Sequence, residues 1–247
     1  MFTLETLAKR YDTGVLALDG VSADIAPGEF VALLGPSGCG KSTLLRLLAG
    51  LEAPSGGRVA WDGHTGAPGP GEIGFVFQDA TLMPWASAAE NVYLPLKLRH
   101  VTRKLAAPKI AAALAQVGLS AFADTRPKGL SGGMKMRVSI ARALVSEPIL
   151  LLMDEPFAAL DEFTRHKLQD DLLALWARTG KTIVFVTHSI YEAAYLANRI
   201  LVMSPRPGRI AADLRASLPM GPHRRASGDY VALVERITGC FREIMPA

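Results

Sequence analysis

The chain has 247 residues and a mass of 26.4 kDa, enough to bury a substantial core as one large domain or two closely packed lobes. No apolar run reaches the roughly 18 residues that a membrane-spanning helix needs, and Met1–Arg10 lacks the basic and apolar stretches of a secretory signal. The two cysteines lie far apart and match no metal-ligand spacing, which argues against a disulfide framework. The net charge of +4 comes from scattered Lys and Arg, which argues against nucleic acid, so we expect a cytosolic protein without a nucleic-acid partner.

Hydrophobic periodicity predicts strands that alternate with helices along the chain. In chain order, we expect strands over Phe2–Leu7, Val15–Ile25, Phe30–Leu34, Arg58–Trp61, Ile73–Phe77, Ile149–Met153, Thr182–Thr187 and Ile200–Met203. Helices are expected over Ser42–Ala49, across a mainly helical region from Ser87 to Val145, and over about Tyr230–Ile244 at the end. A Gly- and Pro-rich piece, Gly63–Gly71, is typical of a surface loop, and a short strand should follow Gly208. This alternation predicts an α/β core with parallel strand pairing.

A glycine-rich loop follows the third predicted strand and precedes a helix. Its residues match the phosphate-loop pattern G-x-x-x-x-G-K-[ST]: Gly35, Pro36, Ser37, Gly38, Cys39, Gly40, Lys41 and Ser42, with Thr43 next in the helix. The glycines let backbone N–H groups surround phosphates, Lys41 adds a positive charge, and the Ser42 hydroxyl can ligate Mg²⁺. We therefore predict binding of a nucleoside triphosphate and Mg²⁺, and we interpret Cys39 as a small side chain tolerated in the loop rather than a redox group.

Two acids follow the apolar run Ile149–Met153, which predicts a buried strand that delivers them to its carboxyl end. Asp154 is expected to hold Mg²⁺, and Glu155 to polarise the water that attacks the γ-phosphate. Without the phosphate loop, these acids would simply be a solvated end of a strand. With it, they predict an enzyme that hydrolyses a nucleoside triphosphate.

A phosphate loop alone leaves kinases, small GTPases and motor ATPases open. The segment Leu130, Ser131, Gly132, Gly133, Met134, with the helix to Leu144, resembles the signature motif of ABC-type ATPases and stands just before the acidic strand, as in that family. Ser131 followed by two glycine N–H groups at a helix start forms a second anion cradle. A serine N-cap alone would explain the helix start but not the two glycines. Met134 departs from the glutamine usual there, so any glutamine contact to nucleotide is absent.

The resemblance covers nearly the whole chain and implies roles for further residues. Gln78 is similar to the glutamine that approaches Mg²⁺, His188 to the switch histidine that contacts the γ-phosphate, and Tyr11 to the aromatic residue that stacks on adenine. From its surroundings alone, Tyr11 would be a strand-edge tyrosine. The motif called the D-loop is matched by Ala158, Ala159, Leu160 and Asp161.

The family implies a P-loop NTPase fold with a RecA-like core, an N-terminal antiparallel β subdomain and an inserted helical subdomain at about 87–146, all within one nucleotide-binding domain spanning 1–247. It also implies that a second copy of the chain supplies its Ser131–Gly133 cradle to the ATP held by the first. Two classes of function remain, an ABC transporter subunit and a soluble ABC ATPase that does not serve transport. The single uninterrupted cassette favours the transporter subunit.

Within importers, Leu82–Trp85 and Met203–Ile210 resemble the nitrate, sulfonate and taurine group, which also serves thiamine pyrimidine precursors. This implies membrane-spanning permease partners, an extracytoplasmic solute-binding protein as an indirect partner, and a peripheral position on the cytoplasmic face of the membrane. Leu82, Met83, Pro84 and Trp85 form an apolar cluster that either receives a short permease helix or belongs to the core of the helical lobe.

Overall fold

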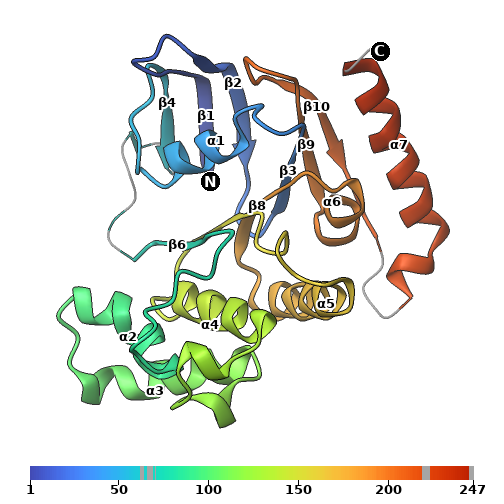
Figure 1. Ribbon diagram of the computed structural model, residues 1–247. Coiled ribbons are helices and arrows are strands. Elements are labelled where there is room, and N and C mark those ends of the chain that lie inside the picture. The colour runs from blue at the N-terminus through green and yellow to red at the C-terminus, as the bar shows by residue number, and fades with distance from the viewer. Residues whose placement is uncertain (62–63, 66–68, 70, 219–222, 245–247) are drawn as a thin grey trace. The chain divides into compact units, whose positions relative to one another are not determined.

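The computed structural model describes residues 1–61, 64–65, 69, 71–218 and 223–244 (Figure 1). The chain divides into two compact units, one made of Met1–Pro68 with Lys181–Ala247 and one of Gly69–Gly180, and each is described by itself. Among the described residues, no helix has the length and apolar character needed to cross a membrane.

The first unit contains an antiparallel sheet in the order β2-β1-β4-β5. Its strands are β1 (Phe2–Arg10), β2 (Leu16–Ile25), β4 (Gly56–Trp61) and β5 (His64–Thr65). Phe2 pairs with Ile25 on one side and Trp61 on the other, and alternate residues of β1 such as Leu4 are buried. One face of the sheet therefore forms core, as the period of two in a strand predicts.

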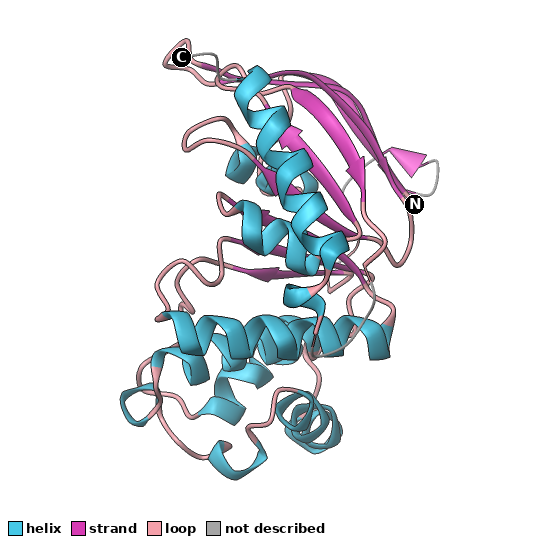
Figure 2. Ribbon diagram, turned by 90° about the vertical axis from the view of Figure 1, so that its right-hand side faces the viewer, coloured by secondary structure: helices cyan, strands magenta, loops and turns pink. Residues whose placement is uncertain are grey.

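Four further strands of this unit lie in the order β10-β9-β3-β8. They are β3 (Phe30–Leu34), β8 (Thr182–Thr187), β9 (Arg199–Met203) and β10 (Ile210–Arg215). β3 runs parallel to both β8 and β9, and all five of its residues are buried, as expected for a parallel strand covered on both faces. The helices are α1 (Lys41–Leu48), α6 (Ile190–Leu196), the short 3₁₀ turn η3 (Arg224–Ala226) and α7 (Gly228–Ile244), which packs on α6 and β10 and stands in front of strands in Figure 2.

The second unit pairs β6 (Ile73–Val76) in parallel with β7 (Leu150–Asp154). Its helices are α2 (Ala88–Leu98), α3 (Arg103–Gln116), α4 (Gly132–Leu144) and α5 (Glu162–Thr179), with 3₁₀ turns η1 (Ser120–Phe122) and η2 (Pro127–Gly129). α4 packs against β6 and against the other three helices. Ser87 and Glu90 start α2 with a reciprocal capping box, which satisfies two backbone donors of its first turn.

The predicted elements agree with these bounds to within a few residues, except that β1 continues to Arg10. The surface loop predicted over 63–71 falls mostly outside the described residues. Inside it, His64–Thr65 pairs with Ala60–Trp61 as a strand, so the loop interpretation was wrong for these two positions. The helical subdomain expected at 87–146 stays a prediction; the compact unit that contains it also includes β6, β7 and α5.

A buried arginine ties β9 to β10 and to the turn before β3. Arg199 Nε and Nη2 donate to the two Asp213 carboxylate oxygens at 2.9 and 2.7 Å, and Nη1 donates to Glu29 Oε2 at 3.1 Å. Arg199 and Glu29 are each only 6% exposed. The hydrogen bonds from Arg199 lower the pKa of Asp213. The pair's stabilisation is thus complete above the ordinary carboxyl pKa and is lost as the pH falls through the lowered value.

We predict that Arg199→Met lowers the free energy of unfolding by about 3 kcal/mol, because it leaves the buried Glu29 carboxylate with a single arginine partner. Urea unfolding followed by circular dichroism measures the change. The matched control is Arg209→Met, which removes an exposed pair with Asp19 and should cost less than about 1 kcal/mol. Equal losses in the two variants would contradict the structural role of Arg199.

Candidate functional site

The phosphate loop occupies the turn between β3 and α1, and its backbone path requires glycine at two positions. A Cβ atom at Gly35 would lie 2.9 Å from Cys39 Sγ and 3.0 Å from the Met203 carbonyl oxygen. Gly40 has φ 108°, and a Cβ there would lie 2.8 Å from the Ala17 carbonyl oxygen. Any larger residue at either position would change the shape of the loop.

Lys41 is the buried charge of this loop, with only 5% of the residue exposed. Its Nζ donates to the carbonyl oxygens of Gly35 and Pro36 at 2.8 and 2.9 Å. Among the described residues, no carboxylate pairs with this ammonium. Gly40 precedes α1 and offers no side-chain cap to the first turn of the helix. A positive charge beside uncapped donors suits a polyphosphate.

Burial raises the pKa of the Cys39 thiol, although Lys41 opposes the shift. The thiol therefore stays protonated at neutral pH, where a protonated thiol is a poor nucleophile. Cys39 is packed inside the loop, with only 1% of the residue exposed. This burial fits its interpretation as a small side chain tolerated there.

A second loop supports the phosphate loop, and the sequence analysis missed this role. Arg206 Nε donates to the Gly38 carbonyl oxygen at 3.1 Å. Gly208 approaches so closely that a Cβ there would lie 2.1 Å from the Cys39 carbonyl oxygen. The sequence analysis placed a short strand after Gly208, but nothing in the sequence placed the residues before that strand against residues 38–39.

Tyr11 lies against the start of α1. Its hydroxyl donates to Glu52 Oε2 at 3.0 Å and lies 3.2 Å from Thr43 Oγ1. Because the tyrosine proton goes to Glu52, the Thr43 hydroxyl acts as donor to Tyr11. Tyr11 is thus oriented by Glu52, a residue that the sequence analysis did not select.

His188 follows β8 and is exposed. Leu34 of β3 pairs in register with Thr187, so His188 and Gly35 emerge side by side from parallel strands. The Thr187 hydroxyl donates to Glu192 at 2.6 Å, which fastens the backbone next to His188 to α6. The first unit thus brings together Tyr11, His188 and the whole phosphate loop, Gly35–Thr43.

The second unit places Gln78 and the two acids at one edge of the β6–β7 pair. Val76 pairs in register with Met153, so Gln78 and Glu155 each lie two residues beyond a paired position. Gln78 is exposed, and Asp154 and Glu155 are half-buried. Glu155 has φ 44°, a left-handed conformation that is rare for a residue with a side chain.

The signature segment begins α4. Ser131 is the N-cap, and its Oγ accepts a hydrogen bond from the Met134 N–H at 3.3 Å. A Cβ at Gly133 would lie 2.5 Å from Thr164 Cγ2, whereas one at Gly132 would make an ordinary 3.6 Å contact with Leu160. Packing against α5 therefore explains Gly133, and none of the described residues requires glycine at 132. Leu130, at the start of the motif, is buried.

The D-loop segment has a structural role that the motif did not reveal. Asp161 is the N-cap of α5, and its carboxylate accepts from the Thr164 N–H at 2.9 Å. This bond lowers the pKa of Asp161. Ala159 is exposed and Leu160 half-buried.

Comparison with known proteins gives consistent matches. The family model described as ABC transporter matches residues 18–158. The chain is similar to the taurine import ATP-binding protein TauB of Rhizobium johnstonii, with 49% identity over 205 residues, 83% of this chain and 78% of the relative. It is also similar to the aliphatic sulfonates import ATP-binding protein SsuB 1 of Pseudomonas syringae pv. syringae, with 49% identity over 212 residues, 86% and 84% of the two chains.

Among solved structures, the chain is similar to the dimeric ATP-binding cassette MJ0796 in a post-hydrolysis state bound to ADP and Pi. The TM-score is 0.76 at 35% identity, over 87% of this chain and 98% of that chain.

We predict that Gly132→Ala leaves the folded chain as stable as before, because its Cβ meets no close contact, yet lowers ATP hydrolysis by about 10²-fold by displacing the nucleotide of a second copy. Thermal unfolding and phosphate release measure the two effects. The matched variant Gly133→Ala should instead lower the melting temperature, because its Cβ meets Thr164. Full activity in Gly132→Ala would refute a role for this glycine in nucleotide contact.

Proposed function

We propose that this chain, which belongs to the ABC transporter family and hydrolyses ATP, drives the import of a small solute across a membrane. The observation that carries the proposal is the likeness, over more than four fifths of the chain, to relatives named as import ATP-binding proteins. An organosulfonate of the taurine or alkanesulfonate kind is the favoured solute. Nitrate and a thiamine pyrimidine precursor are the other candidates from the sequence.

The first unit supplies the nucleotide-binding groups. Lys41 and the N–H groups at the start of α1 bind the phosphates of ATP, and the Tyr11 ring stacks on adenine. Support for the phosphate assignment comes from the buried ammonium of Lys41, whose hydrogen-bond acceptors are neutral carbonyls and a thiol. A polyphosphate supplies the negative charge that this environment lacks.

Glu155 is assigned as the general base that orients the attacking water, and His188 as a γ-phosphate contact. The left-handed backbone at Glu155 supports its assignment, since such strain concentrates where function fixes a side chain. Mg²⁺ would neutralise charge that develops on the phosphates, and we assign its ligation to the oxygen-bearing side chains Ser42, Gln78 and Asp154.

Two copies of the chain act together. The neighbour structure is a dimer, and Gly132 has no structural need for glycine in a single chain. We assign Ser131, Gly132 and Gly133 to the γ-phosphate of the ATP bound by the partner copy. Met134 follows these residues and has no side-chain amide to offer the nucleotide. We also assign the D-loop residues Ala159–Asp161 to the contact between the two copies.

The permease-docking face is assigned to the loop before α2. Trp85 is 72% exposed, Pro84 is exposed, and Leu82 and Met83 are half-buried, which argues against their being core of the helical lobe. Met83 and Trp85 line a groove of about 460 Å³ with Tyr93 and Lys97. Docking there places the chain on the cytoplasmic face of the membrane, with an extracytoplasmic binding protein as an indirect partner. The competing function, a soluble ABC ATPase, would leave this groove without a permease.

We predict that Glu155→Gln lowers ATP turnover by about 10²- to 10⁴-fold while ATP binding persists, because the amide keeps the shape and loses the base. Phosphate release measures turnover, and light scattering after size exclusion, with ATP and Mg²⁺, should show a dimer that accumulates. Glu162→Gln, at the exposed first turn of α5, is the matched control and should hydrolyse at the parent rate. Parent turnover in Glu155→Gln would remove Glu155 from the mechanism.

We predict that cells lacking this chain lose uptake of labelled taurine or an alkanesulfonate, and that the parent gene restores it while the Glu155→Gln gene does not. The Glu155→Gln variant is present in the cell but hydrolyses little ATP, so it tests whether uptake needs ATP hydrolysis and not only the protein itself. Nitrate and a thiamine pyrimidine precursor are tested in the same cells. Unchanged uptake of all four solutes would favour the soluble, non-transport ATPase.

A further inference from the structure

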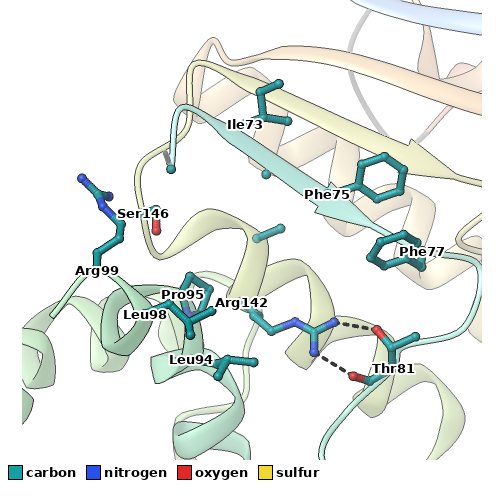
Figure 3. A pocket seen from close by; sticks show the side chains of 13 residues that line it. Ile73, Phe75, Phe77, Thr81, Leu94, Pro95, Leu98, Arg99, Arg142 and Ser146 are labelled. Carbon is teal, nitrogen blue, oxygen red and sulfur yellow. Dashed lines mark hydrogen bonds between the residues drawn. The ribbon is translucent and has the colours of Figure 1, made fainter. Parts of the chain in front are cut away.

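Arg142 lies in the last turn of α4, and its guanidinium reaches the loop that follows β6 (Figure 3). Nη1 donates to the Thr81 carbonyl oxygen at 2.8 Å, and Nη2 donates to the Ala80 carbonyl oxygen at 2.9 Å. Nη2 also lies 2.9 Å from Thr81 Oγ1. A planar guanidinium can hold two successive carbonyls in this way, whereas a lysine ammonium on a flexible stem cannot reproduce the fork.

The loop depends on this side chain for its hydrogen bonds. Within the described residues, the backbone of 79–82 makes no hydrogen bond to any other backbone group. Thr81 has φ 45°, a conformation that a β-branched residue rarely adopts and that surrounding contacts must maintain. The two carbonyl bonds from Arg142 are such contacts.

Burying the charge of Arg142 without a carboxylate partner costs free energy. In the described part of the chain, its partners are neutral oxygens, including Ser139 Oγ at 3.4 Å, and no carboxylate forms an ion pair with it. Burial lowers the pKa of Arg142, because desolvation disfavours the charged form of the guanidinium. Its side chain lines a cavity of about 430 Å³ together with the apolar side chains of Phe77 and Leu94, where an apolar residue would pack at lower cost.

The geometry points to Arg142 as a positioning residue that fixes the loop after Gln78 to the helix that begins with the signature motif. Gln78 lies only two and three positions before Ala80 and Thr81, whose carbonyl oxygens accept the hydrogen bonds from Arg142. Ten residues separate Gly132 from Arg142, about 15 Å along the helix, so a shift of the loop is passed to α4 as a whole. This inference rests on the proposed function, because it acts through the role assigned to Gln78.

A double-mutant cycle between Arg142→Met and Gln78→Ala tests the inference. In the parent background, Arg142→Met should lower kcat for ATP by about tenfold and change KM by less than twofold, because the phosphate loop is untouched. In the Gln78→Ala background, it should lower kcat no further. Arg142→Lys, which keeps the charge but not the fork, should recover only part of the loss. An equal fold loss in both backgrounds would overturn the inference.

Arg137→Met is the matched control. Arg137 lies on the same helix, donates to the Val117 carbonyl oxygen at 3.1 Å and pairs with Asp171, but does not touch the 79–82 loop. It should lower the melting temperature without lowering kcat, and a matching loss of kcat in this variant would reduce Arg142 to a general helix-packing role. A parent protein that releases no phosphate would instead defeat the proposed function, and the inference with it. Full activity in Gln78→Ala would defeat the inference alone.

Discussion

The shape of the phosphate loop depends on the hydrogen bonds of the buried Lys41 ammonium. A lysine can be buried without a carboxylate only if neutral acceptors turn toward it, and the Gly35 and Pro36 carbonyls do so. That orientation requires the compact turn that glycine permits at positions 35 and 40. This loop leaves the end of β3, a fully buried strand that is held in place by parallel pairing with β8 and β9.

Arginine side chains fix two of the loops that carry candidate site residues. Arg206 donates to Gly38 in the first unit, and Arg142 donates to Ala80 and Thr81 in the second. In both cases the acceptor is a backbone carbonyl. Such a bond fixes the path of a loop and leaves that loop's own N–H groups and side chains available for a ligand.

The motifs predicted the phosphate loop, the acidic strand and the helix starts because each depends on local order: a glycine turn, an apolar run, an N-cap. Strand pairing then placed His188 beside Gly35, as parallel alternation implies. Contacts between distant residues could not be read in the same way. The bond from Tyr11 to Glu52, the approach of Gly208 to Cys39 and the need for glycine at 133 each depend on which elements pack together. The strand at His64–Thr65 was missed because a two-residue pairing is too short to show a period.

A left-handed backbone conformation ends the alternation of side chains at the two adjacent acids at the end of β7. In an extended strand, successive side chains point to opposite faces, so Asp154 and Glu155 would diverge if β7 simply continued. The left-handed turn at Glu155 breaks that alternation immediately after Asp154. Thr81, in the loop after the neighbouring β6, has the same uncommon conformation. Two of the five left-handed non-glycine residues in the described part of the chain, Thr81 and Glu155, thus lie in the loops that follow the carboxyl ends of this strand pair, where we propose that the arrangement of Gln78 and the acids matters more than the lowest backbone energy.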